Sequence, residues 1–301
     1  MKLVNLNKNS FSEQIRNGVN LKIGPFCLNI TSSIPEVVAN IHHLYSEHEV
    51  LDNNEFVDFY IDINPPTNIR RWLRPQALFT VDGHQPIEPL PLEHAYPLFE
   101  WGMNWCIANR AHQYLIFHAA IIEKKGKAIL LPGEPGAGKS TFCAALAHNG
   151  WSLMSDELAL LSLAEGKVHP IPKPISLKNE SIKVVSELFP NADFGKTFVN
   201  TSKGTISHLK ALITSQSDAE IKWIIFPKYQ ANANTQLINK NKGETYALLL
   251  NNAFNHNLFG KTCFDTLNHI LEASDTFQLT YSNTTEAVNE INKITADKIQ
   301  S

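Results

Sequence analysis

Apolar and polar positions along the first ninety residues predict short strands around one helix. The expected elements are a strand at 21–30, a helix at 35–48 and a strand at 55–63. A proline-rich stretch over residues 64–93 then interrupts the pattern. The chain is therefore expected to contain a small α+β region over residues 1–90 and a second domain over residues 91–301.

After residue 93 the pattern predicts both helices and strands. Two apolar runs flank a tight turn at Lys125 and Gly126, so they are expected to form a hairpin. The next helix is followed by short apolar strands that no further helix separates, with a turn at Glu165 and Gly166. This order predicts a β-meander rather than a βαβ crossover. The expected elements are helices at 93–110, 139–148, 244–273 and 284–294, and strands at 114–122, 127–133, 152–157, 158–163, 223–229 and 276–282.

Composition and charge narrow the class of protein. The chain has 301 residues, of which 43% are hydrophobic and 18% charged, an ordinary globular composition. A net charge of −3 and the lack of a long basic run argue against a nucleic-acid partner. The first residues show no signal-peptide pattern, and no uncharged apolar stretch is long enough to span a bilayer, so a cytoplasmic location without a membrane partner is expected.

The stretch "LLPGEPGAGKSTF", residues 130–142, carries the strongest chemical signal. Gly133, Gly138, Lys139 and Ser140 match G-x-x-x-x-G-K-[ST], with an apolar strand before the loop and a helix after it. Glycines let backbone N–H groups converge on a phosphate, and the helix N-terminus adds partial positive charge. The alternative is a glycine-rich turn that binds nothing. The residues expected to bind nucleotide are Gly133, Glu134, Pro135, Gly136, Ala137, Gly138, Lys139, Ser140 and Thr141.

Individual side chains of this loop have separate expected roles. Lys139 is expected at a position exposed to the ligand, where it reaches the β and γ phosphates, and the Ser140 hydroxyl is expected to bind Mg²⁺. An acid is also needed, and Asp156 and Glu157 end the first strand after the loop helix. Asp156 is expected to act near the phosphates, whereas a turn acid between antiparallel strands is the alternative for Glu157. His118 could orient Asp156 or meet the γ-phosphate, with a structural strand histidine as the alternative.

The stretch "FHAAIIEKKGKAILLPGEPGAGKSTFCAALAHNGWSLMSDEL" resembles the core of the HPr serine kinase group, which is related to phosphoenolpyruvate carboxykinases. The matching positions are His118, the loop over residues 133–140, Gly150, and the Asp156 and Glu157 pair. The resemblance is specific over residues 115–163 and continues from residue 169 onward as a likeness to HPr-kinase-related proteins. It fades over the first ninety residues.

This resemblance implies an α/β protein with a P-loop core of phosphoenolpyruvate-carboxykinase type and a mixed sheet. It implies ATP and Mg²⁺ as cofactors, with Asp156 accepting the hydroxyl proton and His118 and Lys139 as further catalytic residues. Ser140 and Glu157 would be the metal ligands. Glu157 departs from the family, which has Asp there, and Glu180 is only a candidate for the family's downstream metal ligand.

The expected function is Mg²⁺-dependent transfer of phosphate from ATP to a hydroxyl. The acceptor could be a serine of a peptide or small carrier protein, or a small-molecule alcohol, because the family's segment for its protein substrate is not recognisable. The alternative is an ATP-binding regulatory switch or partner protein that transfers no phosphate. A decarboxylating carboxykinase is disfavoured, and self-association is left open.

Some weaker candidates have equally good functional and structural interpretations. Lys173 lies between two prolines in "PIPKPISLK" and could clamp phosphate or substrate. Lys203, Thr205 and His208 surround a glycine in "TSKGTISHLK", which favours a binding loop. The histidines of "IHHLYSEHEV" lack metalloprotease spacing, so a helix surface is expected there.

Overall fold

The computed structural model describes residues 1–300, which divide into two compact units. Unit 1 comprises residues 1–110 and 193–210, and unit 2 comprises residues 111–192 and the described residues from 211 onward. The first division falls at residue 110, whereas the sequence pattern placed it at residue 90. Helix α3 (Ala95–Arg110) belongs to unit 1 because it packs on strand β5 (Gln76–Val81), where the bare Cα of Gly102 leaves room for the ring of Phe79.

Unit 1 is built on a six-stranded sheet with the strand order β3-β1-β2-β4-β5-β6. The single strand expected at residues 21–30 is two strands that pair as a hairpin, with Val19 opposite Ile30. The β13–β14 hairpin also belongs to this unit, although it is far away in sequence. The unit consists of η1 (Leu3–Asn5), α1 (Lys8–Gln14), β1 (Val19–Ile23), β2 (Phe26–Ser32), α2 (Pro35–Leu44), β3 (Glu49–Leu51), β4 (Phe59–Asn64), η2 (Ile69–Arg71), β5, β6 (Leu90–Pro91), η3 (Leu92–His94), α3, β13 (Phe194–Thr201) and β14 (Gly204–Leu209).

Unit 2 is a mixed α/β structure whose sheet runs β11-β10-β7-β8-β15-β17-β16, with β9 also on β7. The expected hairpin is confirmed, since β7 (Tyr114–Lys124) pairs antiparallel with β8 (Lys127–Pro132). Strands β8, β15 and β17 are parallel neighbours. The other elements are α4 (Lys139–His148), β9 (Ser152–Ser155), β10 (Leu158–Ser162), β11 (Lys167–His169), β12 (Ile175–Lys178), α5 (Glu180–Leu188), β15 (Ala219–Tyr229), β16 (Gln236–Asn239), α6 (Lys242–Asn251), η4 (His256–Leu258), α7 (Gly260–Ala273), β17 (Asp275–Tyr281) and α8 (Thr284–Gln300).

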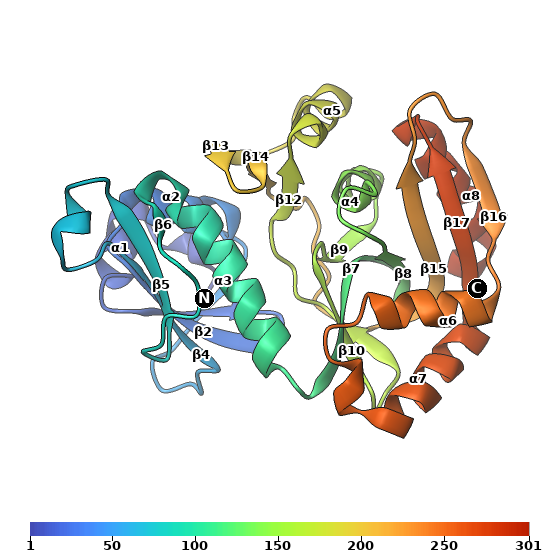
Figure 1. Ribbon diagram of the computed structural model, residues 1–301, viewed down its shortest axis with the longest axis horizontal. Helices are drawn as coiled ribbons and strands as arrows, with labels where there is room; N and C mark the ends of the chain where they lie inside the picture. Colours follow the sequence, from blue (N-terminus) through green and yellow to red (C-terminus); the bar gives the residue numbers. More distant parts are fainter. Residues whose placement is uncertain (301) are drawn as a thin grey trace. The chain divides into compact units, whose positions relative to one another are not determined.

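Helices cover the sheet of unit 2 on its two faces (Figure 1). Alternate residues of β7, such as Phe117 and Ile121, share one buried cluster with Leu249 of α6 and Leu267 of α7. Helix α4 contacts β7, β8 and β9 and also packs on α8. Because strand side chains alternate between faces, the remaining residues of β7, including His118, point away from that cluster.

The expected β-meander after α4 is wrong in one respect. Strands β9 and β10 do not pair with each other, because both pair antiparallel with β7, which is long enough for the two of them. Ser155 lies opposite Ile121 and Leu158 lies opposite His118, so the chain keeps its direction across Asp156 and Glu157. These two acids therefore interrupt one strand edge and do not form a turn. The hairpin across Gly166 is present, since β10 pairs with β11.

Among the described residues, no helix combines the length and the apolar character that a membrane-spanning segment requires.

Candidate functional site

The glycine-rich loop of unit 2 connects the end of β8 to the start of α4. Gly136 and Gly138 have φ values of +87° and +93°, in the left-handed region that favours glycine. A Cβ atom on residue 138 would also lie 2.8 Å from the Tyr281 hydroxyl, too close for an undisturbed contact. The loop leads directly into the first turn of α4, whose backbone N–H groups have no carbonyl partner within the helix. Such a helix N-terminus can bind an anion.

Three segments that are distant in sequence hold the loop in place. The backbone N–H of Tyr229 at the end of β15 donates to the Ala137 carbonyl at 3.1 Å. The Asn252 side chain at the end of α6 accepts from the Gly133 N–H at 3.3 Å. The Tyr281 hydroxyl at the end of β17 donates to the Gly138 carbonyl at 3.4 Å. None of these residues stood out in the sequence, because each acts only through a long-range contact.

Lys139, which the sequence interpretation expects to face the ligand, has 7% of its surface exposed. Its Nζ donates to the Glu134 carbonyl at 3.0 Å and also to the Gly133 carbonyl. Burial lowers the pKa of the ammonium group, and the negative charge of Asp156 acts in the opposite direction. The Lys139 side chain therefore lies over its own loop, and the negative charge of Asp156 favours its protonated form.

Asp156 is the most deeply buried acid near the loop, with 4% of its surface exposed. Its Oδ2 accepts from the backbone N–H of Ser176 at 2.9 Å, and the Ser140 hydroxyl lies near the carboxylate. Burial, followed by the charge of Glu157, raises the pKa of Asp156 to about 6. Asp156 Oδ1 and Ser176 Oγ are buried without a hydrogen-bond partner among the described residues. Buried polar atoms in this state require an explanation, and a bound ligand or ion is one.

The proline-rich segment before β12 forms one wall beside Asp156. Ile171 donates its N–H to the Met154 carbonyl at 2.8 Å, so this segment runs along β9. Lys173 follows with only 5% of its surface exposed, which excludes a freely solvated lysine. The structure therefore places Lys173 between the strand contact at Ile171 and the Asp156 contact at Ser176. Ser176 was missed from the sequence, where an isolated serine carries no signal.

Glu157 follows Asp156 in the gap between β9 and β10, and His118 lies on the neighbouring strand β7. Glu157 is paired with Lys178, with 3.8 Å between its Oε1 and the lysine Nζ, so a metal role requires this pair to open. His118 lies opposite Leu158, donates its backbone N–H to the Asn252 carbonyl at 2.7 Å and meets the Phe254 ring edge-on at 6.2 Å between centroids. Glu180 begins α5 and is exposed.

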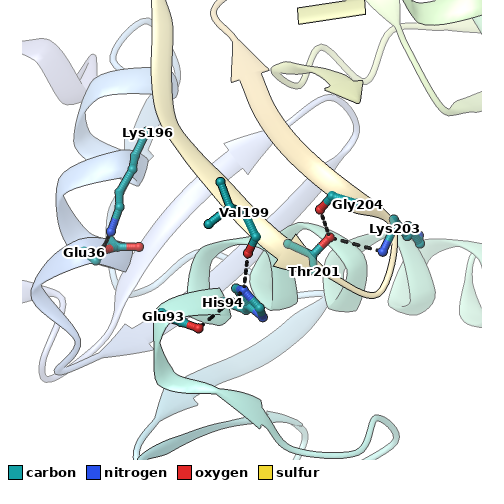
Figure 2. Close-up of polar contacts among 8 residues, drawn as sticks. All are labelled: Glu36, Glu93, His94, Lys196, Val199, Thr201, Lys203 and Gly204. Atoms are coloured by element: carbon teal, nitrogen blue, oxygen red, sulfur yellow. Dashed lines mark hydrogen bonds and ion pairs between the residues drawn. The ribbon is translucent and has the colours of Figure 1, made fainter. Parts of the chain in front are cut away.

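The loop expected around Lys203, Thr205 and His208 belongs to unit 1, where it connects β13 to β14 (Figure 2). The Thr201 hydroxyl donates to the Gly204 carbonyl at 2.6 Å and accepts from the Lys203 N–H at 3.1 Å. The Lys203 Nζ lies 4.6 Å from the centre of the Trp101 ring, and His208 is buried edge-on against Tyr96. These contacts favour a structural role in unit 1 over a binding loop.

A second polar cluster lies in unit 2 at the start of β15. Ligand atoms of Glu165, His169 and Asp218 lie within 4.8 Å of one another, the one such group of potential metal ligands among the described residues. His169 Nδ1 and Asp218 Oδ1 are already 2.7 Å apart, so each satisfies the other. Both carboxylates are exposed. We therefore interpret this cluster as a surface ion pair.

Replacing Asn252 with alanine is expected to destabilise the loop. The amide accepts from the Gly133 N–H and donates to the Leu248 carbonyl at 2.8 Å, and both bonds are lost together. The free energy of unfolding should fall by about 1–2 kcal/mol, as measured by urea denaturation. Asn251→Ala, a change at the exposed neighbouring position, should alter it by less than about 0.5 kcal/mol. Equal effects of the two changes would contradict the anchoring role.

Comparisons with known proteins add one partial match. A family model described as "ScmC: SynChlorMet cassette protein ScmC" matches residues 102–185, less than a third of the chain. This region includes the glycine-rich loop, His118, Asp156 and Glu157. No curated protein matches the chain.

Proposed function

We propose that unit 2 is a P-loop core of phosphoenolpyruvate-carboxykinase type that binds ATP and Mg²⁺ and transfers phosphate to a hydroxyl, as an HPr-kinase-related enzyme would. One observation carries the proposal: Asp156 is buried near Lys139 and Ser140 at the start of α4, and its Oδ1 has no hydrogen-bond partner among the described residues. A glycine-rich turn that bound nothing would have no need of a buried acid at this point.

Nucleotide binding is supported by the geometry of the loop. Positive φ angles at Gly136 and Gly138 turn the backbone ahead of α4, and a loop of this kind lets N–H groups converge on phosphate oxygens. The Lys139 ammonium is held by two loop carbonyls, and a phosphate would offer it stronger, charged acceptors. Residues 133–141 would therefore bind the phosphates of ATP.

The side chains near Asp156 also fit Mg²⁺, which prefers hydroxyl and carboxylate oxygens. Ser140 and Glu157 would hold the ion, provided that Glu157 exchanges its pairing with Lys178. Ser176, whose backbone N–H donates to Asp156, also has a buried Oγ without a hydrogen-bond partner among the described residues. When bound, the ion would neutralise charge on the phosphate oxygens.

Asp156 would act as the base in this reaction. The acceptor oxygen would attack the γ-phosphorus, the bond to the bridging β–γ oxygen would break with ADP leaving, and the hydroxyl proton would pass to Asp156. A base works best when its pKa lies near the operating pH, and a pKa of about 6 fits this requirement. His118, on the strand that pairs beside Asp156, would help to position the acid or the phosphate.

The acceptor is proposed to be a serine of a peptide or small carrier protein, or a small-molecule alcohol. An acceptor screen would follow ADP release from ATP with serine peptides, carrier proteins and small alcohols. Transfer of labelled γ-phosphate to one class would name it. ADP release that no acceptor stimulates would favour the ATP-binding switch.

Thermal unfolding with and without metal tests the nucleotide site. ATP near 100 times its dissociation constant should raise the melting temperature of unit 2 by about 5–10 °C with Mg²⁺ present. The shift should be clearly smaller in EDTA, because Ser140 and Glu157 then lack the ion that joins them to the phosphates. AMP, which lacks the β and γ phosphates, serves as the control and should give little shift. Equal shifts for ATP and AMP, or for Mg²⁺ and EDTA, would contradict the proposed site.

A further inference from the structure

Arginine is concentrated in one surface turn of unit 1. The chain has five arginines, and three of them, Arg70, Arg71 and Arg74, lie within five residues. They belong to the connection between β4 and β5, in a segment where every residue from 67 to 75 is exposed. The turn is therefore positively charged, although the chain as a whole carries a net charge of −3.

Large apolar side chains are exposed in the same turn. Ile69, Trp72 and Leu73 are 65%, 73% and 59% exposed. A single exposed apolar residue is common, but three within five positions form a patch of the kind that marks interaction sites. Tryptophan and arginine are also the residue types most enriched among those that dominate binding energy at protein interfaces.

The backbone of the turn is ordered by local hydrogen bonds. The Asn68 side chain accepts from the Arg70 N–H at 2.9 Å, and the Leu73 N–H donates to the Ile69 carbonyl at 2.9 Å. Arg74 has a φ of +50°, an unfavourable conformation for a residue with a side chain. Asn64 and Leu78 pair across β4 and β5, so the two strands that the turn connects are held together close to its ends. The side chains are thus presented on a shaped loop.

The charges of the turn have no ion-pair partner among the residues that the structure describes. Arg110 pairs with Asp82, but among residues 1–300 none of Arg70, Arg71 and Arg74 forms an ion pair. Three unpaired guanidinium groups beside an apolar patch complement carboxylates that are interspersed with apolar side chains. We propose that the turn over residues 69–74 docks an acidic, partly apolar peptide segment of a partner protein.

Other anionic partners fit less well. Binding to anionic lipid usually relies on clusters of about four to eight basic residues, and this turn has three. Nucleic-acid binding requires a basic face, whereas this chain is acidic overall. The proposal is independent of the kinase assignment, because it rests on unit 1 alone.

Fluorescence anisotropy with a defined probe tests the docking site. The probe is a short fluorescein-labelled peptide of glutamate, leucine and serine, and the same peptide with lysine for glutamate is its control. The full chain should bind the acidic probe saturably, more weakly at high salt, and should not bind the basic one. The double variant Arg70→Glu/Arg71→Glu should weaken binding by about tenfold or more.

Matched variants separate the turn from general charge. Arg16, an exposed arginine elsewhere in unit 1, gives the control Arg16→Glu, which should change affinity by less than about twofold. Trp72→Ala keeps all three arginine charges and should also weaken binding of the acidic probe by about tenfold. This variant tests the contribution of the exposed apolar side chains. No saturable binding, equal affinity in all variants, or stronger competition by phosphatidylserine vesicles or single-stranded DNA would overturn the proposal.

Discussion

Replacing Asp156 with asparagine is expected to reduce phosphoryl transfer by about 10²–10⁴-fold while ATP still binds. Asparagine keeps the shape of the side chain and can accept the Ser176 N–H, but it cannot take a proton from the acceptor. Removing a buried negative charge near the phosphates should leave nucleotide affinity unchanged or improve it. Transfer rate and ATP affinity, measured side by side in the two proteins, check this expectation.

The same variant separates the kinase from the switch. If Asp156 is the base, transfer falls and the Mg²⁺-dependent stabilisation by ATP remains. If that stabilisation disappears as well, Asp156 holds the metal rather than the proton. Unchanged transfer would remove Asp156 from the mechanism. A protein that transfers no phosphate to any acceptor, yet responds to ATP equally in both forms, would be a switch.

The variant should also be more stable at neutral pH. The carboxylate has a folded-state pKa of about 6, above its ordinary value of 3.8, so the folded protein binds more protons between these values. Stability therefore falls as pH rises from about 4 to 6, by up to about 3 kcal/mol, and stays lower above pH 6. Asparagine carries no such penalty. Its advantage over Asp156 should shrink below pH 5, and transfer by the unmodified protein should decline below pH 6.

Replacing Lys139 with alanine is expected to weaken ATP binding by about 100-fold or more. Hydrogen bonds from an ammonium group to charged acceptors are each worth about 1.5–3 kcal/mol, and this side chain is the one the loop sequence assigns to the β and γ phosphates. Isothermal titration with ATP and Mg²⁺ measures the loss. The melting temperature should change little, because the carbonyls of Gly133 and Glu134 can then accept from water.

An exposed lysine of the same unit provides the control. Lys183 on α5 pairs loosely with Glu187 at 3.9 Å, and Lys183→Ala should leave ATP affinity unchanged. Equal ATP binding by Lys139→Ala and the unmodified protein would contradict the nucleotide site. A large loss of melting temperature in Lys139→Ala alone would instead identify Lys139 as a structural residue of the loop.

Local patterns in the sequence were sufficient for most elements of unit 2. Helix α4 begins and ends at the expected residues because glycine precedes it at 138 and its apolar positions have helical spacing. The hairpin of β7 and β8 follows from two apolar runs and a turn at Lys125 and Gly126. Pairing between strands is not local, and the sequence pattern alone suggested a turn at Asp156 where the chain continues along β7.

The division into units and the surroundings of the site depended on the tertiary structure. The sequence determined that the glycine-rich loop, Lys139 and Ser140 belong to one candidate site, because a motif fixes their spacing. It predicted Asp156 from its place at the end of the next strand. Only the folded chain brought in Asn252, Ser176 and Tyr281, whose hydrogen bonds and contacts cross 20 to 143 positions. A single asparagine, serine or tyrosine has no local signature, since its partner is chosen by strand order and helix packing. Residues 193–210 likewise belong to unit 1 through long-range contacts, and the pattern of apolar and polar residues does not predict contacts of this kind.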